Sequence, residues 1–174
     1  MTWMQTYTGL KFDLQNPQPK DINIIDIAHA LAYSNRFNGH GHFFYSIAQH
    51  SIHVSDLLPT KLRFQGLMHD AAETYVGDLI RPLKFPDFRA LEHRILKTIF
   101  ETFGVSWPVD PQVKDADLRI LLNEARDVMG GQTFPWQIEG KPFPDLIIGH
   151  WDPKFAKEKF LEKFHDCVER EKYR

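Results

Sequence analysis

The spacing of the apolar residues constrains the fold of this chain more than any other feature. Apolar side chains recur three and four residues apart in one segment after another, while the alternation typical of a half-buried strand is absent. This spacing predicts helices over residues 24–36, 45–58, 62–75, 91–103, 113–125 and 153–173. Because helices without a sheet bury their apolar faces against one another, we predict an all-α bundle with short connections.

Residues that break or cap helices separate these segments. Asp21 is a candidate N-cap for the first helix, and Pro59 ends the second. Gly104 closes the fourth, and the pair Gly130-Gly131 closes the fifth. The boundaries of the predicted helices are therefore marked by residue type as well as by the end of the apolar pattern.

The length of 174 residues fits a single domain, 1–174, with one hydrophobic core. We place that core at about residues 21–130. Residues 1–20 are polar and are expected to form a loop or a short extended segment laid on the domain. Residues 132–150 include Pro135, Pro142, Pro144 and Gly140, and we expect an irregular excursion there before the C-terminal helix over 153–173.

Composition narrows the class of protein. Hydrophobic residues make up 43% of the chain, which excludes disorder, and the net charge of −2 gives no sign of a nucleic-acid binder. The one cysteine, Cys167, excludes an internal disulfide and fits a reducing compartment. A signal peptide and a stretch of the roughly 18 apolar residues that a membrane span requires are both missing. We therefore expect a cytoplasmic protein with no membrane partner.

Side chains of the kind that bind metals surround the adjacent pair His69-Asp70. An imidazole and a carboxylate are good ligands for a divalent ion. His50 lies upstream of the pair, and Asp117, with Asp115 as an alternative, lies downstream. In a helical bundle these residues fall on different helices, and bundles build metal sites from side chains on facing helices. His50, His69, Asp70 and Asp117 are thus candidate metal ligands.

Phosphate chemistry is suggested by the residues around this set. Glu73 follows His69 by four residues and Asp70 by three, so on one helix it would lie beside the ion, placed to orient or deprotonate a water. Arg36 precedes a glycine-containing loop, and a guanidinium binds phosphate bidentately. Lys84 is a possible second phosphate contact. A divalent ion would generate the nucleophile near neutral pH and neutralise phosphoryl charge.

Several of these and other polar residues have plainer interpretations. Asp78, after Gly77, could act in catalysis or simply cap the next helix. We expect His29 to be a hydrogen-bonded core residue or one that supports a ligand, and His53 to be an interior or surface histidine, rather than ligands themselves. The remaining histidines are expected on the surface: His40, His42, His93, His150 and His165. Two of them, His40 and His42, flank the Arg36 loop.

Five short motifs together resemble the HD-domain superfamily of metal-dependent phosphohydrolases, which is named for such a His-Asp pair. The closer similarity is to the 5′-deoxynucleotidase-like branch, including small virus-encoded members of which some are deoxynucleoside triphosphohydrolases that act on dATP. It covers about residues 7–130 and does not extend over 132–150. The motifs are Arg36-Phe37-Asn38, Gln49-His50-Ser51, His69-Asp70-Ala71-Ala72-Glu73, Gly77-Asp78-Leu79 and Lys84.

The resemblance implies a role for each matching residue and a single-domain HD-type helical bundle. Asp117 rather than Asp115 would be the last ligand, because the Leu-x-x-Leu-x-x-Glu run that follows it matches the family. Phe37 stands where the family has a tryptophan, so a ring that can stack on a base is kept. The remaining implied roles are metal binding by His50, His69, Asp70 and Asp117, catalysis or binding of substrate and water by Glu73 and Asp78, and phosphate binding by Arg36.

The function expected from the resemblance is hydrolysis of deoxynucleotide phosphates, as a 5′-deoxynucleotidase or a dNTP triphosphohydrolase. The implied cofactor is a divalent ion, with Mn, Co, Zn, Ni, Fe and Mg all open, and the implied assembly is a homo-oligomer, either a dimer or a hexamer. Two alternatives stay open: a phosphodiesterase or other phosphate-ester hydrolase of the same superfamily, and a metal-binding scaffold without catalysis.

Overall fold

The computed structural model of the protein describes residues 2–131, 134 and 136–172. Helices dominate this part of the chain, which confirms the predicted all-α class. Short 3-10 turns lie between several helices and are labelled η1 (Pro19–Asp21), η2 (Arg36–Gly39), η3 (Thr60–Leu62) and η4 (Arg81–Leu83). The helices are α1 (Ile24–Tyr33), α2 (Ile47–Leu57), α3 (Arg63–Met68), α4 (Glu73–Val76), α5 (Pro86–Phe103), α6 (Pro111–Asp127) and α7 (Pro153–Lys172).

A small hairpin precedes the helices, where a loop or short extended segment was predicted. Strands β1 (Trp3–Gln5) and β2 (Lys11–Asp13) pair antiparallel, with Met4 opposite Phe12. Each strand has only three residues, which is too short for an alternating pattern to be recognised in the sequence. Phe12 is fully buried and fastens the hairpin to the helical core.

The first helix differs from its prediction at both ends. Its N-cap is Asn23, whose side chain accepts a hydrogen bond from the backbone N–H of Ile25 at 2.9 Å, so the expected cap at Asp21 was wrong. The helix ends at Tyr33, because the backbone N–H of Arg36 donates instead to the carbonyl of Tyr45 at 2.9 Å. This pairing closes the loop between α1 and α2 and places Arg36 beside α2.

The predicted helix over 62–75 is broken around the His-Asp pair. Helix α3 ends at Met68, and residues 69–72 form a turn before the short α4. Within the turn the backbone hydrogen bonds span three residues, from Ala71 N–H to the Met68 carbonyl at 3.0 Å and from Glu73 N–H to the Asp70 carbonyl at 2.9 Å. The tighter winding carries His69 and Asp70 on a turn rather than inside a regular helix.

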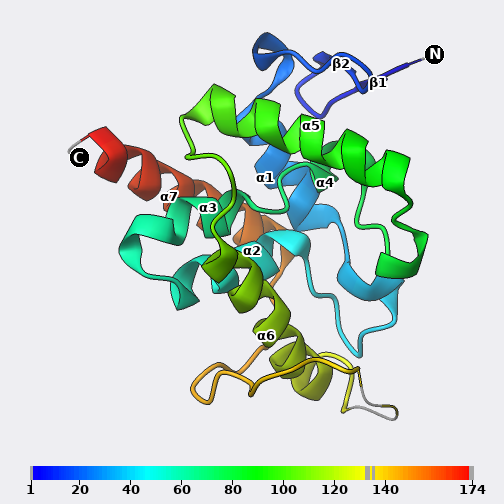
Figure 1. Cartoon of the computed structure of the whole chain (residues 1–174), viewed down its shortest axis with the longest axis vertical. Helices are drawn as coiled ribbons and strands as arrows, with labels where there is room; N and C mark the ends of the chain where they lie inside the picture. The colour runs from blue at the N-terminus through cyan, green and yellow to red at the C-terminus, as the bar shows by residue number, and fades with distance from the viewer. Residues whose placement is uncertain (1, 132–133, 135, 173–174) are drawn as a thin grey trace.

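Helix α2 lies at the centre of the bundle, and it packs against α1, α3, α6 and α7 (Figure 1). It is buried along nearly its whole length, including the polar residues Gln49, His50, Ser51 and Ser55. One apolar cluster joins α1, α2, α3, α5 and α7, and a smaller one lies between α2 and α6. A polar residue on α2 is therefore held in the interior by packing on several sides.

The described residues of the predicted irregular excursion over 132–150 contain no helix or strand. Side-chain hydrogen bonds fasten it to α6: the Asn123 amide donates to the carbonyls of Phe143 at 2.8 Å and Leu146 at 2.9 Å. Pro135 and the predicted helix end at Tyr173 lie outside the described residues. Among the described residues, none of the helices combines the length and apolar character needed to cross a membrane.

Candidate metal centre

Three separate parts of the chain bring the predicted ligands together. His50 is on α2 and fully buried, His69 and Asp70 are on the turn between α3 and α4, and Asp117 is on α6. The convergence follows from the packing of α2 against both α3 and α6. His50 and Asp117, which are 67 positions apart in the sequence, thus face one another where these helices pack.

The ligand atoms of His50, His69 and Asp117 all lie within 4.8 Å of one another, so this group can hold a metal ion. The Nε2 atom of His50 is 3.2 Å from Oδ1 of Asp117, and that of His69 is 3.9 Å from the same oxygen. Both Nε2 atoms are buried, and in the described part of the chain neither makes a hydrogen bond. Two buried nitrogens aimed at a shared point without a hydrogen bond fit a cation between them.

The outer nitrogens of both imidazoles are fixed by hydrogen bonds. Nδ1 of His50 donates to Oε1 of Glu124 at 2.6 Å, and Nδ1 of His69 donates to the carbonyl of Gly66 at 2.7 Å. A proton on Nδ1 leaves the lone pair of Nε2 directed at the candidate site, and such outer partners orient metal-binding histidines in general. The two rings are therefore held in the tautomer that a metal requires.

Asp70 borders this group. Its Oδ2 atom lies 3.1 Å from Nε2 of His69, 3.5 Å from Nε2 of His50 and 3.6 Å from Nη1 of Arg36. Asp115, the alternative to Asp117, points away from the site: its side chain is 69% exposed and lies 3.9 Å from Arg119. The structure thus favours Asp117 over Asp115, and it places Asp70 against both histidines.

Glu73 is buried beside Asp70. Its Oε1 accepts from Nζ of Lys84 at 3.2 Å, while Oε2 makes no hydrogen bond with any described residue. Burial, followed by the charges of Asp70 and Asp78, raises the pKa of Glu73 well above its usual value and outweighs the opposite effect of Lys84. Burial therefore favours the protonated form of Glu73 more than it is favoured in an exposed glutamate.

Arg36 lies between two carboxylates at the floor of the site. Nη2 is 3.3 Å from Oε2 of Glu124, and Nη1 is 3.6 Å from Oδ2 of Asp70. Burial lowers the pKa of Arg36, but these two carboxylates outweigh it, so the group stays charged. Phe37 and Asn38 follow with φ angles of 57° and 50°, a left-handed conformation that costs energy in residues other than glycine and is common at functional sites.

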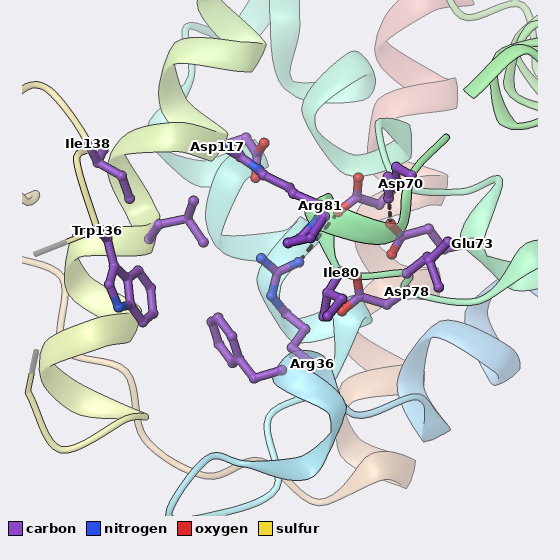
Figure 2. Close-up of a pocket in the computed structure, with 14 residues that line it drawn as sticks. Arg36, Asp70, Glu73, Asp78, Ile80, Arg81, Asp117, Trp136 and Ile138 are labelled. Carbon is purple, nitrogen blue, oxygen red and sulfur yellow. Dashed lines mark hydrogen bonds and ion pairs between the residues drawn. The ribbon is translucent and has the colours of Figure 1, made fainter. Parts of the chain in front are cut away.

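A cavity of about 580 Å³ opens over these side chains (Figure 2). Arg36, Asp70 and Asp117 contribute to its lining together with Glu73 and Asp78. Such a volume is typical of small-molecule sites. Aromatic and aliphatic residues form the other wall: Phe37, Leu121, Trp136 and Ile138.

The lining of this cavity shows where two predicted site residues, Asp78 and Phe37, lie. Asp78 lines it and caps no helix, because the 3-10 turn η4 begins at Arg81 and α5 has Phe85 at its N-cap position. The capping interpretation of Asp78 was therefore wrong. Phe37 lines the cavity beside Trp136, with ring centroids 5.9 Å apart and ring planes inclined by 46°.

Sequence reasoning gave no site role to Glu124 or Trp136, although Glu124 ends the Leu-x-x-Leu-x-x-Glu run that follows Asp117. Glu124 follows Asp117 by seven residues, which is two turns of α6 on the same face, so a helical projection from Asp117 could have found it. It is fully buried and bonds to both His50 and Arg36. Trp136 belongs to the irregular excursion, where no periodic pattern indicates which residues face the domain.

The other histidines lie outside the candidate centre. His53 is partly buried, and burial lowers its pKa to about 4. His29 is only partly buried and stacks on Tyr7 with ring centroids 3.7 Å apart, so it belongs to a surface aromatic group rather than the core. Five other histidines are exposed on the surface, as expected: His40, His42, His93, His150 and His165. His93 also lines a smaller cavity, together with Lys84.

The buried Glu124 leads to a prediction about metal affinity. Glu124→Gln keeps the size of the side chain but removes the charge that orients His50, so we expect metal affinity to fall by about 10- to 100-fold. Competition with a chromogenic chelator for Co²⁺ or Zn²⁺ measures the change. Glu101→Gln on the exposed face of α5 is the matched control. An unchanged affinity in Glu124→Gln would show that His50 does not depend on this carboxylate.

Comparison with known proteins relates the whole chain to bacterial proteins. No family model matches the chain. It is 36% identical over 176 residues to the uncharacterized protein YfdR of Escherichia coli K12, and the match covers 99% of both chains. It is also 34% identical over 164 residues to an uncharacterized protein of Rhodobacter capsulatus, covering 84% of each. With such identity over nearly its full length, the chain belongs to the same protein family as YfdR.

Proposed function

We propose that the protein is a metal-dependent phosphohydrolase that acts on deoxynucleotide phosphates. The observation that carries this proposal is the grouping of His50, His69 and Asp117, of which Asp117 also lines the cavity of about 580 Å³ together with Asp70. The proposal is supported further by Glu73 and Arg36, which line the same cavity, and by the resemblance of these motifs to HD-domain phosphohydrolases.

The donor set of the site suits a borderline divalent ion. Two imidazoles with one or two carboxylates are compatible with Mn, Fe, Co, Ni and Zn. In our proposal Asp70 completes the set, because its Oδ2 already faces both histidines. When bound, such an ion supplies Lewis-acid chemistry that acidifies a water molecule and neutralises charge on a phosphoryl oxygen.

Glu73 is the proposed general base. Its Oε2 has no hydrogen-bonding partner among the described residues, and its Oε1 is held by Lys84, so the carboxylate has a fixed orientation and a free oxygen. In the proposed reaction this oxygen accepts a proton from the attacking water. Asp78, the second carboxylate on this wall of the cavity, would bind water or a substrate hydroxyl.

The opposite wall is proposed to bind the nucleoside. Phe37 and Trp136 present aromatic rings to the cavity, and Leu121 and Ile138 add aliphatic surface. Aromatic rings bind nucleobases by stacking, with little preference for one base. In this arrangement the phosphate lies toward Arg36 at the floor and the base lies toward Trp136.

The assembly and location of the protein are also proposals. We infer a homo-oligomer, a dimer or a hexamer, from the resemblance to the deoxynucleotidase-like branch. Light scattering coupled to size-exclusion chromatography distinguishes these states from a monomer. A cytoplasmic location is proposed because Cys167 is a free, buried thiol.

A phosphate-release screen tests the proposed function. Purified protein loaded with Co²⁺ or Mn²⁺ is incubated with each deoxynucleoside mono-, di- and triphosphate, and the nucleoside products are identified by chromatography. We expect release of phosphate or of a polyphosphate from at least one deoxynucleotide. Turnover of bis-p-nitrophenyl phosphate alone would indicate a phosphodiesterase instead, and metal binding without any hydrolysis would indicate a scaffold.

A further inference from the structure

Three cationic side chains line the main cavity, and they differ in how far their charge is already neutralised. Arg36, at the floor, lies within ion-pair distance of Glu124 and Asp70. Its side chain is only 10% exposed. An additional phosphate would therefore compete at this guanidinium with two carboxylates that are fixed in the protein.

Lys84 is neutralised in the same way. Its Nζ is 2.7 Å from Oε1 of Glu92 on α5 and 3.2 Å from Oε1 of Glu73. The two bonds join the segment after η4 to α4 and to α5. Lys84 therefore serves to fasten this segment, and little of its charge remains available to a ligand.

Arg81 is the exception. Among the residues that the structure describes, it is the one cation lining the main cavity that has no carboxylate within ion-pair distance. It is exposed, and Figure 2 shows its side chain projecting across the cavity in the direction of Asp117. Its charge is available to an anion that enters the cavity.

The backbone around Arg81 is held in place by local hydrogen bonds. The N–H of Lys84 donates to the carbonyl of Arg81 at 3.2 Å, and Pro82 restricts the turn η4. Nε of Arg89, in the first turns of α5, donates to the carbonyl of Lys84 at 2.9 Å. With the Lys84 ion pairs, these bonds fix the base of the Arg81 side chain while its guanidinium reaches into the cavity.

We propose that Arg81 binds the phosphate group of the substrate and supplies the uncompensated positive charge of the cavity. This inference rests on the proposed phosphohydrolase function, and it adds a residue that the family resemblance does not contain. A guanidinium bonds to phosphate through two parallel N–H groups. A guanidinium without a carboxylate partner gains more free energy on binding phosphate than one that is already paired. Arg36, which lines the same cavity, would face the same phosphate from below.

Binding of inorganic phosphate to the Zn²⁺-loaded protein tests the proposal without requiring turnover. Arg81→Gln is expected to raise the dissociation constant for phosphate by about tenfold or more, since a hydrogen bond to a charged group is lost. Arg81→Lys should recover part of the affinity because it restores the charge. Titration followed by NMR of the arginine side-chain Nε–H groups gives the constants.

Two controls accompany these variants. Arg170→Gln, which removes a surface arginine from α7 at a different cavity, should bind phosphate as the unmodified protein does. Zn²⁺ affinity should be the same in all four proteins, because Arg81 makes no bond to the candidate ligands. With a deoxynucleotide that the protein hydrolyses, Arg81→Gln should raise KM more than it lowers kcat.

The outcomes separate this proposal from the proposed function. Phosphate binding that depends on Arg81, in a protein that hydrolyses no deoxynucleotide, supports the Arg81 proposal and removes the phosphohydrolase one. Equal phosphate affinity in Arg81→Gln and the unmodified protein overturns the Arg81 proposal even if hydrolysis is observed. Absence of phosphate binding by the unmodified protein overturns it as well.

Discussion

Replacing Asp70 with alanine is expected to abolish metal binding and, with it, phosphate hydrolysis. Its Oδ2 atom is the carboxylate oxygen nearest to Nε2 of His69, at 3.1 Å, and it also lies 3.5 Å from Nε2 of His50. Without it, two neutral imidazoles and Asp117 would have to hold a divalent ion. Metal content after dialysis, measured by inductively coupled plasma mass spectrometry, gives the result directly.

The matched control for Asp70→Ala is Asp115→Asn, which removes an exposed carboxylate from α6. We expect this control to keep both metal and activity. Arg36 retains Glu124 as a partner in Asp70→Ala, so the variant should fold, and its circular dichroism spectrum checks this. An Asp70→Ala protein that still carries one equivalent of metal would exclude Asp70 as a ligand.

Replacing Glu73 with glutamine is expected to remove turnover while metal binding is retained. The change keeps the shape of the side chain but removes the proton acceptor, and general-base catalysis contributes about 10²- to 10⁴-fold to rate. We therefore expect kcat to fall by about that factor, with Zn²⁺ or Co²⁺ affinity close to that of the unmodified protein. Steady-state kinetics and chelator competition on the same preparations measure the two quantities.

Glu92→Gln separates the proposed catalytic role of Glu73 from its ion pair with Lys84. Both variants remove one carboxylate partner of Lys84, but only Glu73 also lines the main cavity. Glu92→Gln should therefore affect kcat much less than Glu73→Gln does. Similar losses in the two variants would mean that the effect comes from displacement of Lys84, and that another group accepts the proton.

Most of the bundle could be predicted from the sequence, because burial against a helical neighbour imposes the spacing of apolar residues. The same spacing could not show the break at residues 69–72, where Ala71 and Ala72 are buried as they would be in a regular helix. The difference lies in which backbone carbonyl each N–H selects, and apolar patterning carries no information about that choice. The hairpin before α1 was beyond prediction for the simpler reason that its strands are so short.

The candidate site was predictable where its residues are of unusual types and close in sequence. His69 and Asp70 are adjacent, and the added presence of His50 and Asp117 made a metal site the most economical interpretation. Glu124 is as central to the geometry, yet in the sequence a single glutamate on an amphipathic helix cannot be distinguished from an exposed surface residue. Its importance comes from full burial, which depends on the packing of α6 against α2.

The two oxygens of Glu124 have a thermodynamic consequence, because one bonds to His50 and the other to Arg36. A cation at Nε2 of His50 makes the Nδ1–H group a stronger donor and draws the carboxylate charge toward it. The hold of Glu124 on Arg36 then weakens, which leaves that guanidinium more attractive to an anion. Metal and anion would therefore bind cooperatively, and by linkage each would increase the affinity for the other by the same factor.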